Sequence, residues 1–144
     1  MSTRILVLGQ FVPSILTVDI IAIELRRWLL ERGIDPIDAI PVRGPEDHLK
    51  LSKPDSPIMV WHRDGLSNKN YTDQVAVPSV RWMILWSNGT PTHLKLINGP
   101  QYCAKPFDVV LVDNHKVMHK CPPSEPNRFF VRILEPLLPK GLIQ

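Results

Sequence analysis

The chain has 144 residues, of which 44% are hydrophobic and 22% are charged. This composition argues against a disordered chain, and the length fits a single domain (residues 1–144) with a sizeable core. The formal net charge of +3 permits weak attraction to polyanions, but no run of lysine and arginine is long enough to predict a nucleic-acid tract.

Residues 4–8 are apolar and predict a first strand, which is followed by an amphipathic helix. Ser14 or Thr17 is expected to cap the helix, and Gly33 is expected to stop it. A helix with one apolar stripe needs a sheet to cover, so we expect it to pack on the β-structure that follows. The stripe is formed by four residues at helical spacing: Ile21, Leu25, Trp28 and Leu29.

After the helix, the chain is divided by turn-forming residues into short apolar pieces. Fifteen prolines and only seven glycines favour short elements separated by rigid turns. Eight strands at this spacing predict a sandwich or jelly roll. The expected strands lie near residues 37–42, 57–62, 80–87, 92–97, 101–104, 108–112, 116–120 and 128–134.

Three connections carry specific expectations. Asn88-Gly89 predicts a tight hairpin between the strands on either side, because both residues tolerate a positive φ. Asp113-Asn114 is expected to turn residues 109–112 back into residues 117–119 in the same way. The polar segment 65–78 shows no periodicity and is interpreted either as a substrate lid or as a loop without contact to the chemistry.

A candidate metal site begins at Trp61-His62-Arg63-Asp64. Residues i and i+2 of a strand point to the same face, so His62 and Asp64 can converge on one ion. A third ligand must come from elsewhere in the fold, and the segment Asp113-Asn114-His115-Lys116-Val117-Met118-His119 offers two histidines, of which His119 is the leading candidate. Two imidazoles and one carboxylate on one side of a metal are the arrangement of non-haem Fe(II) oxygenases.

The segments 60–65 and 106–119 together resemble the 2-oxoglutarate and Fe(II)-dependent oxygenases. The resemblance covers roughly residues 56–134, and it implies a mainly β (α+β) fold in which these residues form a double-stranded β-helix (jelly roll, cupin-like) core. Residues 1–55 would then supply the N-terminal strand and the amphipathic helix that packs on this core. In this family the distal histidine commonly follows an Asp-Asn turn by a few residues, so the resemblance assigns His62, Asp64 and His119 as the metal ligands.

The family also uses a basic residue on the last strand to bind the distal carboxylate of 2-oxoglutarate. Arg128 and Arg132 are the candidates, and their spacing places both on one face of a strand. A guanidinium can grip a carboxylate with two parallel hydrogen bonds. Arg128 is slightly favoured by its position at the start of the strand, and Lys95 is a minor competitor because some members use a lysine from another strand.

The resemblance therefore implies a dioxygenase that uses Fe(II), 2-oxoglutarate and O2 to hydroxylate a substrate, releasing succinate and CO2. A small molecule or a protein side chain is expected as substrate rather than nucleic acid. Two alternatives stay open. One is a zinc module built from His62, Cys103, His119 and Cys121. The other is a β-sandwich that binds or assembles without catalysis.

The N-terminus and the two cysteines bear on localisation. Residues 5–16 are apolar enough to mimic a short signal peptide, but Gln10, Pro13 and Asp19 argue against one, and no small-residue cleavage site follows. No stretch reaches the roughly 18 to 20 apolar residues of a membrane span. The cysteines form no Cys-x-x-Cys pair, which fits a reducing compartment, so we expect a cytoplasmic protein.

Overall fold

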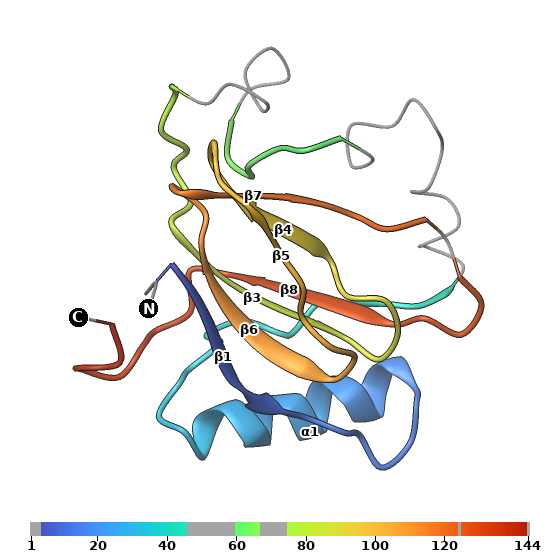
Figure 1. Cartoon of the computed structure of the whole chain (residues 1–144). Helices are drawn as coiled ribbons and strands as arrows, with labels where there is room; N and C mark the ends of the chain where they lie inside the picture. The colour runs from blue at the N-terminus through green and yellow to red at the C-terminus, as the bar shows by residue number, and fades with distance from the viewer. Residues whose placement is uncertain (1–3, 46–59, 67–74, 124, 144) are drawn as a thin grey trace.

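The computed structural model describes residues 4–45, 60–66, 75–123 and 125–143. The described residues are mainly β, as the sequence predicted, and α1 is the helix among the elements that they form (Figure 1). The elements are β1 (Ile5–Gln10), α1 (Val18–Leu30), β2 (Val42–Arg43), β3 (Trp82–Ser87), β4 (His93–Leu96), β5 (Gln101–Tyr102), β6 (Asp108–Asp113), β7 (Val117–Lys120) and β8 (Phe130–Leu134).

The strands form two antiparallel sheets. The larger sheet has the order β1-β6-β3-β8-β2, and the smaller has the order β5-β4-β7. An isolated bridge pairs His62 with His119 of β7, so the chain around His62 extends the smaller sheet beyond β7. The expected strand near 37–42 is reduced to β2, and residues 57–59 of the expected strand near 57–62 lie outside the described residues.

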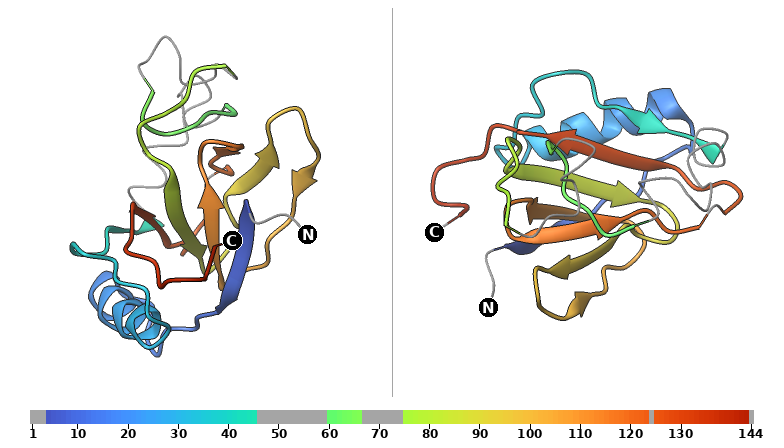
Figure 2. Two further views of the ribbon diagram at one scale, coloured as in Figure 1. Left: turned by 90° about the vertical axis from the view of Figure 1, so that its left-hand side faces the viewer. Right: turned by 90° about the horizontal axis from the view of Figure 1, so that it is seen from above.

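The helix covers the face of the larger sheet that is turned away from β4 and β5 (Figure 2). Thr17 caps α1 by accepting a hydrogen bond from the N–H of Ile20, and Gly33, at φ 76°, follows its last turn. The apolar stripe predicted from the sequence is buried at Ile21, Leu25 and Leu29. These side chains pack with residues of the larger sheet in one apolar cluster, which accounts for the helix lying there.

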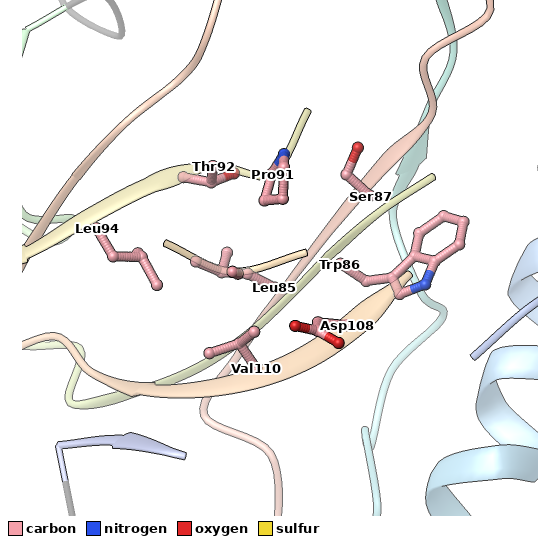
Figure 3. Close-up of a pocket in the computed structure, with 9 residues that line it drawn as sticks. Leu85, Trp86, Ser87, Pro91, Thr92, Leu94, Asp108 and Val110 are labelled. Carbon is pink, nitrogen blue, oxygen red and sulfur yellow. The ribbon is translucent and has the colours of Figure 1, made fainter. Parts of the chain in front are cut away.

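The central strands β3 and β6 are apolar on both faces because both faces are covered. In β3, Ile84 and Trp86 belong to the cluster beneath α1, whereas Met83 and Leu85 belong to a second cluster between the two sheets. Figure 3 shows Trp86 and Leu85 pointing to opposite sides of the strand, beside a cavity of ≈ 10 Å³ between the sheets. A strand buried on both faces reads as a continuous apolar run, which is what residues 82–86 are.

The predicted hairpin at Asn88-Gly89 is wrong, and so is the predicted return at Asp113-Asn114. Strands β3 and β4 lie in different sheets, as do β6 and β7, so both turns carry the chain from one sheet to the other. Neither Asn88 nor Gly89 adopts a positive φ. Each asparagine instead binds a distant backbone: Asn88 accepts from the N–H of Phe129 at 2.6 Å, and Asn114 binds the peptide of Asp64.

In the part of the chain that the structure describes, no helix has both the length and the apolar character needed to cross a bilayer.

Candidate metal centre

Three predicted ligands come together at the edge of the smaller sheet. Ligand atoms of His62, Asp64 and His119 all lie within 4.8 Å of one another. Among the described residues, no other group of three or more potential ligands is as compact. The bridge between His62 and His119 brings the two imidazoles together, with hydrogen bonds of 3.0 and 2.9 Å between their backbones and ring centroids 4.3 Å apart.

The imidazole of His62 is held in the form that a metal ligand requires. Its Nδ1 lies 2.8 Å from the carbonyl oxygen of Val60, and because a carbonyl can only accept, Nδ1 carries the proton and Nε2 keeps its lone pair. Burial and the charge of His119 lower the pKa of His62, against the opposing effects of Val60 and Asp64. The ring is therefore neutral at neutral pH. Its Nε2 lies 3.7 Å from Oδ1 of Asp64.

His119 is buried, at 3% exposure, yet neither of its ring nitrogens has a hydrogen-bond partner. Its Nε2 lies 3.4 Å from Oδ1 of Asp64, the same oxygen that faces His62. Buried polar atoms are nearly always hydrogen-bonded or bound to an ion, so this imidazole requires an explanation. A cation shared by the three side chains would provide it.

Asp64 is ionised and closely surrounded by positive groups. Burial raises the pKa of its carboxyl, but the contact with His119 and the charges of His119, Arg132 and His62 outweigh burial and lower the pKa to about 2. Its Oδ2 forms an ion pair with Arg132 at 3.0 Å. The site therefore offers one ionised carboxylate and two imidazoles, a donor set that suits a divalent transition metal.

Asp64 ends the ligand-bearing segment at a sharp turn. Gly65 follows at φ 85°, and a Cβ at this position would lie 2.9 Å from Oγ of Ser79 and 3.1 Å from N of Val80. Both the backbone angle and the close approach require glycine. The Asp64-Gly65 pair therefore supplies a candidate ligand and the turn that leads the chain away from it.

A small cavity opens beside the imidazoles. It has a volume of ≈ 20 Å³, room for about one water molecule in this conformation. Leu85 and Thr92 line both this cavity and the one drawn in Figure 3, so the site lies at the end of the space between the sheets. The lining is formed by His62, His119, Leu85, Thr92, Cys121, Phe130 and Arg132.

The two candidate arginines have different surroundings. Arg132 lies in β8, lines the cavity and is 41% exposed at its side chain. Arg128 precedes β8, so the expectation that both share one strand face is wrong. The Arg128 side chain is buried. Its Nε donates to the carbonyl of Thr90 at 2.7 Å and lies 4.0 Å from Oε1 of Glu125.

The remaining candidates lie away from the three ligands. The ammonium of Lys95 is 4.9 Å from the ring centroid of Trp61 and is not among the groups that line the cavity. His115 lies in the turn before β7, where its N–H donates to Oδ1 of Asp113 at 3.0 Å. Of the two cysteines, Cys121 lines the cavity and Cys103 is exposed elsewhere, so the four residues of the zinc alternative do not form one described cluster.

Two supporting residues were missed from the sequence. Arg63 is 2% exposed, and its guanidinium donates to the carbonyls of His115, at 2.9 Å, and Ala76. Asn114 is fully buried and binds Asp64. The sequence could not indicate these roles, because arginine and asparagine are usually surface residues and their buried partners lie in distant segments.

Residues 67–74 of the expected lid lie outside the described part of the chain.

Comparison of the chain with protein-family models, with curated proteins and with solved structures found no match.

Proposed function

We propose that the chain is an Fe(II)- and 2-oxoglutarate-dependent oxygenase that oxidises a small molecule or a protein side chain. The observation that carries the proposal is the convergence of His62, Asp64 and His119 within 4.8 Å, with the nitrogens of His119 buried and unsatisfied. When bound there, Fe(II) with 2-oxoglutarate and O2 supplies the oxidation of a C–H bond, with release of succinate and CO2.

The strand order supports a double-stranded β-helix as the finer description of the sandwich. With the His62 segment counted as a strand, one sheet contains β2-β8-β3-β6 and the other contains the His62 segment, β7, β4 and β5. These eight segments fill two four-stranded sheets, and consecutive segments lie in different sheets except for β4 and β5. In this description β1 is an additional strand at the edge beside β6.

The chain's own residues have separate tasks in the proposed reaction. His62, Asp64 and His119 would hold the metal. Arg132 is the proposed partner of the distal carboxylate of 2-oxoglutarate, because it is the arginine that lines the cavity. With a cation bound at Asp64, the ion pair between Asp64 and Arg132 would weaken, which would leave the guanidinium available to the carboxylate.

The apolar side chains beside the ligands keep bulk water from the reacting atoms. Leu85 and Phe130 line the cavity together with Thr92. Exclusion of water strengthens the attraction between a carboxylate and a guanidinium.

With two free cysteines in the described chain, we place the protein in the cytoplasm, where thiols stay reduced.

The test is metal binding followed by turnover. Purified protein loaded anaerobically with Fe(II) is expected to develop a visible absorption band on addition of 2-oxoglutarate and to produce succinate in air. His62→Ala, Asp64→Ala and His119→Ala should each abolish both signals. His93→Ala is the matched control, since His93 lies in β4 beside Trp61 and not among the ligands.

Other outcomes would identify the alternatives. Zinc that copurifies with the protein and is not displaced by Fe(II) would indicate a zinc module. Protein that binds neither metal would indicate a β-sandwich with a binding or assembly role. Succinate production that persists in any of the three ligand variants would rule out the proposed site.

A further inference from the structure

The segment that carries two of the three proposed ligands is held mainly by polar contacts. An isolated bridge joins His62 to His119, and Arg63 donates to the carbonyls of His115 and Ala76, whereas residues 60–66 supply no member of either apolar cluster among the described residues. The position of Asp64 relative to His119 must therefore be set by something other than core packing. Polar contacts around Asp64 are the remaining candidates.

The side chain of Asn114 takes the place that a neighbouring strand would have. Its Oδ1 accepts from the N–H of Asp64 at 3.1 Å, and its Nδ2 donates to the carbonyl of Asp64 at 2.8 Å. A carboxamide has the same donor and acceptor groups as a peptide, so it can pair with a backbone in both directions. Asn114 thus continues, through its side chain, the pairing that the backbones begin at His62 and His119.

Asn114 is itself fixed on two other sides. Nδ2 also donates to the carbonyl of Val80 at 2.8 Å, and the backbone N–H of Asn114 donates to the carbonyl of Arg81 at 2.6 Å. These two residues lie directly before β3 of the larger sheet, and Asn114 has no exposed surface. The amide therefore transmits the position of the larger sheet to a ligand at the edge of the smaller one.

We infer that Asn114 is a positioning residue of the metal centre, which fixes the Asp64 carboxylate at the distance from His119 that one cation requires. The inference rests on the proposed metal site. Residues that orient metal ligands without touching the metal commonly change the affinity by about 10- to 100-fold when they are removed. Loss of the Asn114 amide is expected to act in this range, because Asp64 loses two backbone bonds at once.

The test compares Asn114→Ala with Asn88→Ala, a matched control. Asn88 also binds two backbone groups across a sheet-crossing turn, the N–H of Phe129 and the carbonyl of Asn127, but it does not touch the ligand segment. Co(II) is the probe, and three quantities are measured: the Kd, the visible spectrum of bound Co(II), and the urea unfolding of the metal-free protein. Asn114→Ala is expected to raise the Kd about 10- to 100-fold and to change the spectrum.

The control separates positioning from general stability. Asn88→Ala is expected to lower stability while the Kd changes less than about threefold and the spectrum is unchanged. An unchanged Kd and spectrum in Asn114→Ala, or equal losses of affinity in both variants, would overturn the inference. Should Asn114→Ala not fold, Asn114→Asp is measured against the same criteria, because it keeps the acceptor for Asp64 but neither donor.

Failure of the proposed metal site would look different. In that case the wild-type protein itself would bind Co(II) no more tightly than His119→Ala. Wild-type protein that binds Co(II) normally while Asn114→Ala binds it equally well would refute the role of Asn114 alone.

Discussion

Replacing Arg132 with methionine is expected to weaken the binding of 2-oxoglutarate without removing the metal. Methionine keeps much of the apolar stem but loses the guanidinium, which lies 3.0 Å from Asp64 at the wall of the cavity. Hydrogen bonds to a charged group contribute roughly 1.5 to 3 kcal/mol, which corresponds to about a 10- to 150-fold change in Kd. Because the Arg132 side chain is 41% exposed, we expect the lower end, near tenfold.

The assay is calorimetric titration of 2-oxoglutarate into Mn(II)-loaded protein, which does not turn over. Arg128→Met is the comparison, since Arg128 is 1% exposed and donates to the carbonyl of Thr90. This variant should lose stability in urea, by about 1.5 to 3 kcal/mol, and should keep most of its affinity for 2-oxoglutarate. Loss of affinity in Arg128→Met with none in Arg132→Met would refute the assignment of Arg132.

Three further predictions follow from the described contacts. Co(II) at 100 times its Kd should raise the midpoint of thermal unfolding by roughly 5 to 10 °C, and His119→Ala should abolish the shift; a shift that survives would mean that Co(II) binds elsewhere. Burial raises the pKa of the Cys121 thiol, against the charges of Arg128 and Arg132, so in a Cys103→Ser variant Cys121 should react slowly with a thiol reagent at pH 8. Bound Zn(II) should slow that reaction further, and equal rates would show that Cys121 does not face the metal. The backbone N–H of Ser14, and then its hydroxyl, lower the pKa of Glu24 below 4.5. This interaction therefore stabilises the fold fully above pH 4.5, and the stabilisation is lost as the pH falls through the lowered pKa. An NMR titration should show that Ser14→Ala raises the pKa of Glu24.

The sequence predicted the elements better than their pairing. Strands near 80–87, 108–112 and 128–134 were recognisable because runs such as residues 82–86 are apolar throughout, and the stripe of α1 has clear helical spacing. The partners of those strands were not recognisable. Asn88-Gly89 has the residues of a tight hairpin turn, but the tertiary contacts of Asn88 with the loop before β8 determine a different turn.

The residues of the candidate site were likewise predicted only in part. The strand spacing of His62 and Asp64 predicted that both side chains would converge, and the structure brings them together with His119 and not with His115. The roles of the supporting residues could not be predicted, because they depend on segments far apart in the sequence. Asn114 reaches Asp64 only because the turn before β7 lies beside the end of the His62 segment.

The ligand segment lies apart from the two apolar clusters, so the candidate site and the core can evolve separately. Two of the three proposed ligands lie on a stretch that supplies no member of the two described apolar clusters, so substitutions at His62 or Asp64 leave the side chains of those clusters unchanged. A lineage could lose or exchange the proposed ligands, and with them the proposed chemistry, while the strands of the two sheets stayed in place. The fold would then persist as a scaffold on which the chemistry is optional.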